Sequence, residues 1–139
     1  MQKFMADIEQ IRQELTWKLR QNELYPDLPL SAIKLPEDED GTHLGLFHQD
    51  RLVVVVSLFE KDNSLQLRKL ATDKKYQRLG LGTKMMLYVL AYAREKNLAK
   101  VWCNARLSAV KFYQQLGFNQ KGEVFSRAGI DYIIMEIKI

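Results

Sequence analysis

The centre of the chain changes from a strand-like to a helix-like pattern of hydrophobic positions. Residues 65–71 alternate apolar and polar side chains in their first half, which is the period of a half-buried strand. A basic segment with two glycines follows, and after it apolar side chains recur at spacings of three and four. This recurrence predicts a helix with one apolar stripe, formed by Leu81, Met85, Tyr88, Val89 and Tyr92.

The first third of the chain predicts one helix and one loop. Apolar residues share a helical face from Asp7 to about Leu24; Asp7 can cap the start, and Pro26 ends the pattern. Residues 25–42 have the composition of a loop, and the acidic run within it, residues 36–41, is expected to be solvated. A weaker interpretation of the run is that it attracts a cationic amine.

The remaining segments predict strands and one short helix. The helix covers residues 109–116, with Ser108 as its cap and Gly117 as its stop. The order strand–helix–strand over residues 65–105 implies a parallel pair, and the other neighbours are expected to be antiparallel. The fold class is therefore α+β with a mixed sheet. Further strands are expected at residues 43–48, 51–60, 100–105, 119–125 and 131–137.

Length, charge and cysteine content limit the function. A chain of 139 residues fits one domain over residues 1–139, and its net charge of +4 favours a polyanionic ligand but is too small to indicate nucleic acid. Cys103 is the only cysteine, which is consistent with a reducing compartment. The sequence shows no secretory signal and no apolar run of membrane length. We therefore expect a cytoplasmic protein without membrane or nucleic-acid partners.

The segment between the central strand and helix has the features of an anion site. Gly80 and Gly82 allow a close approach of the backbone, and the first amides of the following helix point outward. Lys74, Lys75 and Arg78 add positive charge beside them. The two glycines alone are as consistent with a basic surface turn as with a phosphate site.

Two familiar phosphate motifs do not fit this segment. A dinucleotide fingerprint needs a third glycine where the chain has Met85. A P-loop needs Gly-Lys-Ser/Thr after an upstream glycine, whereas Gly82, Thr83 and Lys84 come in the wrong order. If this segment binds phosphate, it does so through a motif other than these two.

The segment resembles the acetyl-CoA signature of the GNAT acetyltransferase superfamily, Gln/Arg-x-x-Gly-x-Gly/Ala. The resemblance implies a mixed, mostly antiparallel central sheet flanked by helices, with a splayed parallel strand pair at the acetyl-CoA site. Residues 19–21 and 43–45 are similar to a small bacterial subgroup of undefined substrate. The implied contacts to the cofactor phosphates come from Gln77, Arg78, Leu79, Gly80, Leu81, Gly82 and Thr83.

A second segment, residues 109–118, resembles the family's A-x-x-x-Y-x-x-x-G-F motif. The resemblance implies that the hydroxyl of Tyr113 lies near the CoA sulfur and acts as a general acid for the departing thiolate. Packing alone is the alternative role for Tyr113. The family often has an asparagine where this chain has Arg106, with Asn104 two residues earlier; both are implied cofactor contacts.

The same resemblance assigns backbone contacts and leaves the base open. Leu70, Ala71 and Thr72 are implied to pair with the pantetheine arm as an added strand would. Many family members carry a glutamate where Gln66 stands, and Gln66 cannot act as a base. Glu60 is the nearest carboxylate candidate, and a water chain is an equal alternative.

The leading hypothesis is an N-acetyltransferase that moves the acetyl group of acetyl-CoA to a primary amine by direct attack. The acceptor is a small molecule or a peptide, no metal is expected, and a homodimer is allowed. Cys103 is expected to be a packed strand residue without a nucleophilic role. One alternative is a non-catalytic CoA-binding sensor or interaction module on the same fold. A nucleic-acid binder that uses residues 74–76 is disfavoured, because it lacks interleaved aromatic residues.

Overall fold

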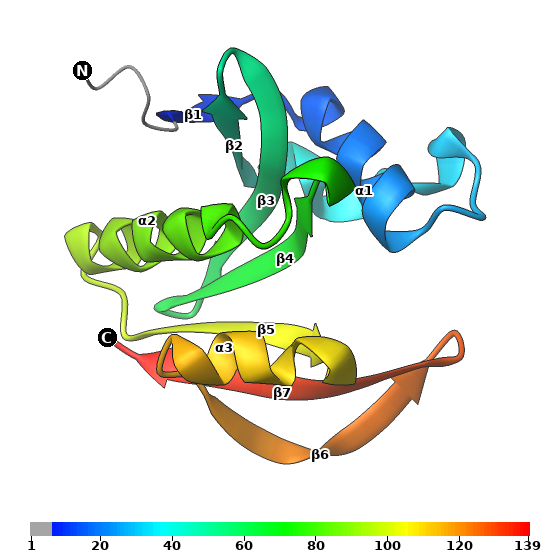
Figure 1. Cartoon of the computed structure of the whole chain (residues 1–139). Coiled ribbons are helices and arrows are strands. Elements are labelled where there is room, and N and C mark those ends of the chain that lie inside the picture. The colour runs from blue at the N-terminus through cyan, green and yellow to red at the C-terminus, as the bar shows by residue number, and fades with distance from the viewer. Residues whose placement is uncertain (1–6) are drawn as a thin grey trace. The chain divides into compact units, whose positions relative to one another are not determined.

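A computed structural model describes residues 7–139, which form a seven-stranded sheet and three α-helices (Figure 1). The first six residues lie outside the described residues. The prediction that the N-terminus carries no secretory signal concerns these residues in part. The helices are α1 (Trp17–Leu24), α2 (Leu81–Glu95) and α3 (Val110–Gln115). The strands are β1 (Asp7–Ile11), β2 (Thr42–His48), β3 (Arg51–Lys61), β4 (Ser64–Thr72), β5 (Lys100–Arg106), β6 (Asn119–Arg127) and β7 (Ile130–Lys138).

The sheet is mixed and mostly antiparallel, with the strand order β1-β2-β3-β4-β5-β7-β6. Its parallel pair is β4 with β5, in a register that joins Ser64 to Lys100 and Gln66 to Trp102. The α+β prediction with one parallel pair is therefore confirmed. The chain divides into two compact units, Met1–Phe59 with Leu67–Tyr88 and Glu60–Gln66 with Val89–Ile139. The expectation of a single domain over residues 1–139 stays a prediction.

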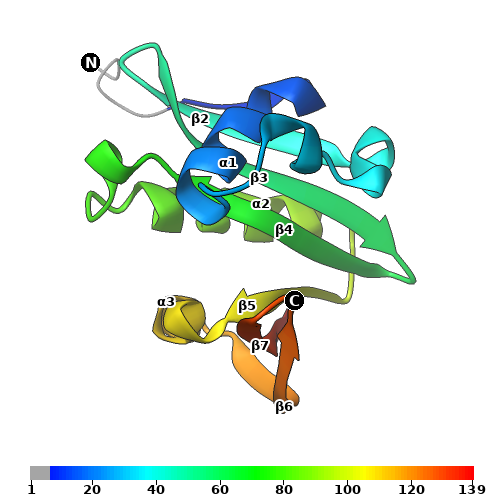
Figure 2. The ribbon, with the colours of Figure 1, turned by 90° about the vertical axis from the view of Figure 1, so that its right-hand side faces the viewer.

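The first unit is built on β1, β2, most of β3 and the second half of β4. A two-residue turn joins β2 to β3, with Gln49 and Asp50 at φ angles of 52° and 65°. This left-handed pair matches the twist of the flanking strands. In this unit α1 and the first half of α2 cover opposite faces of the strands (Figures 1 and 2). Leu19 of α1 packs in a buried cluster with Val55 and Ala71.

The second unit contains β5, β6 and β7, and α3 lies over one face of these strands (Figure 1). β7 pairs antiparallel with β5 on one side and with β6 on the other. Burial alternates along β5, so that Val101, Cys103 and Ala105 are buried while the residues between them are half-buried. This alternation is what a strand with one covered face requires.

The predicted helix from Asp7 to Leu24 is wrong in its first half. Residues 7–11 form β1, which pairs antiparallel with β2, and α1 begins only at Trp17. Asp7 therefore caps no helix. The apolar helix face predicted for this segment would include Leu15, but Leu15 is 43% exposed. Hydrogen bonds between β1 and β2 satisfy the backbone groups along one edge of β1. They stabilise the strand more than the spacing of Ile8 and Ile11 would stabilise a helix.

Two details of the later helices also differ from the sequence prediction. In α2 the buried face includes Met86, Leu90 and Ala93, whereas Tyr88 of the predicted stripe is 42% exposed. At the start of α3, Ser108 lies in a 3₁₀ turn, Leu107–Ala109, and no side-chain hydrogen bond caps the helix. Among the described residues no helix combines the length and the apolar character needed to cross a membrane.

Candidate functional site

The glycine loop lies in the first unit, between β4 and α2. Gly80 has a φ angle of +79°, and no atom lies within 4 Å of the position that a Cβ would take there. Arg78 is also left-handed, with a φ angle of 67°. The loop is exposed from Gln77 to Gly80, and α2 begins directly after it at Leu81. A ligand can therefore approach the backbone of this loop closely.

Several contacts hold the start of the loop in place. The side chain of Gln77 donates to the carbonyl of Thr72 at 3.0 Å, and the backbone N–H of Asp73 donates to the carbonyl of Val53 at 2.8 Å. The backbone N–H of Lys74 donates to the carboxylate of Glu23 at 2.9 Å. The entry to the loop is thus tied to α1 and to β3 before any ligand binds.

The start of α2 suits a phosphate group. Lys84 donates its backbone N–H to the carbonyl of Gly80 at 3.0 Å, which closes the first helical turn. The amides before it have no acceptor inside a helix and carry the positive end of the helix dipole. Lys74, Lys75 and Arg78 supply three cations from the same loop. The residues present therefore fit the pyrophosphate of a CoA molecule.

Strand β4 carries an irregularity just before the predicted backbone contacts. Lys69 is left-handed, with a φ angle of 59°, although it is neither glycine nor asparagine. Leu70, Ala71 and Thr72 follow it and lead into the loop. Lys69 also contacts Tyr25, because its ammonium hydrogen-bonds to the phenol and lies 4.6 Å from the ring centroid. A non-glycine residue in this conformation is a marked feature of a strand.

Tyr113 lies in the second unit, on α3, and is 6% exposed. Its ring packs edge-on against Phe118 and Phe112, at centroid distances of 5.3 and 5.1 Å. Gly117, at a φ angle of +98°, ends the helix, and the N–H of Phe118 donates to the carbonyl of Tyr113 at 3.1 Å. The Gly-Phe pair of the sequence motif thus reverses the chain and packs an aromatic ring on the tyrosine.

Tyr113 and Cys103 of β5 are buried neighbours that affect each other's pKa. Burial is the main cause that raises the pKa of Tyr113 well above its ordinary value, and the neighbouring Cys103 raises it further. Burial also raises the pKa of Cys103 to about 12, although the neighbouring Tyr113 acts to lower it. Both groups are therefore neutral at physiological pH, and Cys103 is a buried thiol, as expected for a packed strand residue.

The other candidates of the second unit lie on β5 and at the end of β3. Asn104 and Arg106 are half-buried residues of the strand and face the β7 residues Ile134 and Tyr132 in the ladder. Glu60 is exposed, and its carboxylate pairs with Lys96 at 3.5 Å. The structure thus places Gln77–Thr83 beside the end of β4 in one unit, and Tyr113 against Cys103 in the other.

A buried polar network in the first unit was missed by the sequence analysis. Asp38, expected to be solvated with the rest of the acidic run, is 1% exposed. Arg20 binds both of its carboxylate oxygens, at 2.8 and 2.9 Å, and also donates to Ser57 at 2.8 Å. Ser57 lies 2.7 Å from Nδ1 of His43, and Nε2 of that ring lies 2.8 Å from the carbonyl of Asp38. A carbonyl can only accept, so Nε2 carries a proton.

Two signals in the sequence point to this network. Ser57 interrupts the apolar run of β3, and a polar side chain inside a buried strand needs a partner. Arg20 follows Leu19 on the buried side of α1, where an arginine is stable only when paired. The network fixes the Pro36–Asp40 turn onto β3, so that Asp38 is structural and only its neighbours in the acidic run face solvent.

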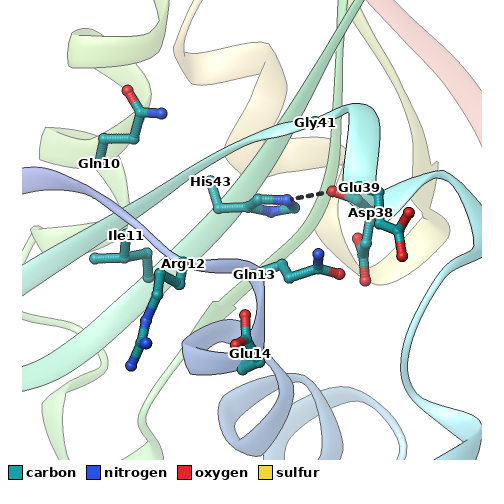
Figure 3. Close-up of a pocket in the computed structure, with 9 residues that line it drawn as sticks. All are labelled: Gln10, Ile11, Arg12, Gln13, Glu14, Asp38, Glu39, Gly41 and His43. Atoms are coloured by element: carbon teal, nitrogen blue, oxygen red, sulfur yellow. Dashed lines mark hydrogen bonds between the residues drawn. The ribbon is translucent and has the colours of Figure 1, made fainter.

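A pocket of about 540 Å³ opens above this network, at the end of β1 and the start of β2 (Figure 3). Gln13 extends into it from one side towards Asp38 on the other, and the His43 ring lies beside them, joined by its hydrogen bond to the carbonyl of Asp38. The buried Oε1 atom of Gln13 has no hydrogen-bond partner among the described residues. No three His, Cys, Asp or Glu side chains within residues 7–139 are grouped to hold a metal ion.

Residues 22–139 match the model of the acetyltransferase (GNAT) domain family. The uncharacterised N-acetyltransferase YitI of Bacillus subtilis (strain 168) is 29% identical over 141 residues, which cover 94% of this chain and 95% of that protein.

Solved structures show the same fold at low identity. A proposed N-acetyltransferase from Lactobacillus plantarum gives a TM-score of 0.86 at 17% identity, over 96% of this chain and 97% of that one. A GNAT family acetyltransferase from Elizabethkingia anophelis, crystallised with acetyl-CoA bound, gives a TM-score of 0.76 at 16% identity, over 96% and 98%.

Proposed function

Because this chain belongs to the GNAT acetyltransferase family, and is thus an acyl-CoA-dependent N-acetyltransferase, we propose that it transfers the acetyl group to a primary amine by direct attack. The neutral amine attacks the thioester carbonyl of acetyl-CoA, the C–N bond forms, and the C–S bond breaks. The amine loses one proton and the thiolate gains one, so the products are an amide and CoA. The acceptor is a small molecule or a peptide.

The glycine loop and the end of β4 are proposed to hold the co-substrate. Gly80, Gly82 and the first amides of α2 bind the pyrophosphate, and the exposed cations of the loop neutralise its charge. Leu70, Ala71 and Thr72 offer backbone groups to the pantetheine arm after the left-handed Lys69. Asn104 and Arg106 are further proposed contacts.

The observation that carries the proposal is the setting of Tyr113, which is 6% exposed and packs against Phe118 and Phe112 in the segment that resembles the family's tyrosine motif. A general acid must hold its proton at the working pH, and a phenol, with an ordinary pKa of about 10, does so. A thiolate of ordinary pKa, about 8.5, accepts a hydrogen bond from such a phenol as the C–S bond breaks. Tyr113 then recovers its proton from the amine through solvent.

Replacement of the hydroxyl tests this role. In Tyr113→Phe the ring keeps its contacts to Phe118 and Phe112, so the fold and the KM for acetyl-CoA should stay unchanged. We expect kcat with a competent amine to fall by about 10²–10⁴-fold, the usual contribution of general acid catalysis. The measurement is steady-state kinetics with thiol detection, and Phe112→Leu, on the same helix, serves as a packing control.

Equal turnover of Tyr113→Phe and the parent would contradict the assignment. A protein that binds acetyl-CoA but acetylates no amine in a broad panel would instead be a non-catalytic CoA-binding sensor. Burst kinetics with a labelled acyl-enzyme would contradict direct attack and indicate a covalent intermediate.

The proton acceptor for the attacking ammonium is proposed to be Glu60 or a chain of water molecules. Glu60 is exposed and paired with Lys96, so Glu60→Gln should fold normally. If Glu60 is the base, its removal lowers kcat and abolishes the acidic limb of the pH profile. An unchanged profile assigns the step to water. We further propose a cytoplasmic location, where acetyl-CoA and a free thiol are compatible, and a homodimer, which sedimentation would detect.

A further inference from the structure

Two adjacent cations of β4, Arg68 and Lys69, point to the same face of the sheet. Arg68 pairs at 3.0 Å with Glu37, in the turn that α1 holds against β3. Lys69 donates a hydrogen bond to the phenol of Tyr25, the residue directly after α1. Neighbouring side chains of a regular strand point to opposite faces. The left-handed φ angle of Lys69, 59°, breaks this alternation and turns its ammonium towards the face that α1 covers.

Lys69 differs from Arg68 because its charge has no counter-ion. Arg68 has the carboxylate of Glu37, and its guanidinium lies 5.5 Å from the ring centroid of Phe59. The ammonium of Lys69 contacts a neutral phenol and lies 4.6 Å from the ring centroid of Tyr25. Within residues 7–139 no carboxylate lies within 4 Å of this ammonium. A half-buried cation on a strained backbone, without a counter-ion, is suited to an anionic ligand.

Lys69 lies at the point on β4 that the tip of the proposed pantetheine arm would reach. The arm starts at the pyrophosphate on the glycine loop and runs back along β4 over Leu70–Thr72, and Lys69 is the next residue in that direction. The parallel register of β4 with β5 extends from Ser64 to Gln66, so Lys69 lies beyond it. In this binding mode the acyl group, and the amine that attacks it, come next to Lys69.

From these observations we infer that the acceptor is an amine that also carries a carboxylate, and that the ammonium of Lys69 binds this carboxylate. The inference rests on the proposed function and on the proposed course of the arm along β4. The phenol of Tyr25 holds the ammonium in place for the acceptor. Lys69 keeps its own proton and forms no covalent bond.

The charge of Lys69 selects the acceptor and helps the attack. An amine without an anionic group is an ammonium ion in solution, and Lys69 repels it. A carboxylate on the same molecule reverses this effect, because it forms a charge-assisted hydrogen bond with the lysine. Once the acceptor is bound, a nearby cation disfavours its ammonium form, and only the neutral amine has the lone pair that attacks the thioester.

Matched pairs of acceptors test the inference. Free glycine, β-alanine and γ-aminobutyrate are each compared with their amides, which keep the amine and lose the negative charge. The readout is the ratio of kcat/KM for the acid to kcat/KM for its amide. Lys69→Met should lower this ratio by about ten- to hundredfold, the effect of one hydrogen bond between charged groups. Lys69→Arg keeps the charge and should keep most of the ratio, whereas Tyr25→Phe should lower it by roughly two- to tenfold.

Lys18→Met provides the matched control. Lys18 is an exposed residue of α1, so the substitution makes the same change of charge at the surface and should leave the ratio as in the parent. A lysine that only joins β4 to the end of α1 would behave differently. Its removal would raise the KM for acetyl-CoA or lower the Tm, and would slow the reactions of acid and amide alike. Thermal melts of all variants show that each protein is folded at the assay temperature.

The outcomes separate this inference from the proposed function. If the parent uses acid and amide equally well, or if Lys69→Met slows both alike, the inference is overturned and acetyl transfer to an amine stands. If the parent binds acetyl-CoA but acetylates no amine of the panel, the proposed function fails, and the inference fails with it. A preference for the acid that Lys69→Met abolishes and Lys69→Arg keeps would support the inference.

Discussion

At the scale of single residues, Asp38 is the group whose environment differs most from its sequence context. It lies in an acidic run but is enclosed by Arg20 and by the backbone N–H of Leu35, which donates to it at 2.9 Å. Burial acts to raise the pKa of Asp38, but the hydrogen bonds from Arg20 and Leu35 and the charge of Arg20 outweigh it, so that the pKa is lowered. The carboxylate is therefore charged in the folded protein.

Removal of this charge should be costly. Asp38→Asn leaves the buried guanidinium of Arg20 without a counter-ion, and we expect a loss of about 3–5 kcal/mol in the free energy of unfolding. Denaturation by urea measures it. Glu39→Gln, in the same turn and paired with Lys34 only at the surface, should change stability by less than about 0.5 kcal/mol. Equal effects of the two variants would contradict the structural role of Asp38.

The same pair predicts the direction of a pH dependence. The pKa of Asp38 is lower in the folded than in the unfolded protein, where the ordinary value is 3.8. Its contribution to stability is therefore complete above about pH 5 and is lost as the pH falls through and below the unfolded value. Urea melts between pH 6 and pH 3 should show a steeper loss for the parent than for a variant in which both Arg20 and Asp38 are replaced by apolar residues.

At the scale of elements, the sequence predicts best where local signals and tertiary contacts agree. β3 is recognisable because four consecutive valines are all buried, and the left-handed turns after β3 and before β7 contain the turn-forming residues Asp62, Asn63 and Gly129. β1 was not predictable, because it forms a strand only through its pairing with β2, in which Ile8 lies opposite Leu46. The local sequence of residues 7–11 does not indicate this long-range pairing.

The candidate site also has parts that local sequence predicts and parts that depend on tertiary contacts. The glycine loop and the Tyr113 segment follow from short motifs, because a turn before a helix and a Gly-Phe helix end are local structures. The partner of Tyr113 does not follow in this way. Cys103 is ten positions away on β5, and only tertiary packing brings the two side chains near enough to affect each other's pKa. The same holds for the contact of Arg20 with Asp38.

The start of α2 gives a prediction at this scale. Gly82→Asp places a carboxylate in the first helical turn, where it stabilises the helix through the dipole but repels a pyrophosphate. We expect thermal stability equal to or above that of the parent, and a loss of acetyl-CoA affinity of at least tenfold in calorimetry. Asn97→Asp, the same charge change at the other end of α2, should bind as the parent does. Unchanged affinity in Gly82→Asp would place the phosphates elsewhere.

At the scale of the whole molecule, charge and ligand act together. The net charge of +4 attracts any polyanion at low ionic strength, so binding of acetyl-CoA must be separated from unspecific attraction. A specific ligand binds the folded state alone and stabilises it by mass action, whereas a diffuse attraction is largely screened at physiological salt.

This difference gives the last prediction, a thermal shift at physiological salt. At a free concentration 100 times its dissociation constant, acetyl-CoA should stabilise the fold by about 2.7 kcal/mol. For a chain of this size that corresponds to a rise in Tm of roughly 5–15 °C. ATP at the same concentration carries a similar charge but no pantetheine arm and should give a clearly smaller shift. Gly82→Asp should lose most of the shift with acetyl-CoA while keeping its own Tm. Equal shifts with ATP and acetyl-CoA in the parent would mean that the loop recognises charge alone, and that the pantetheine contacts assigned to Leu70, Ala71 and Thr72 contribute nothing to binding.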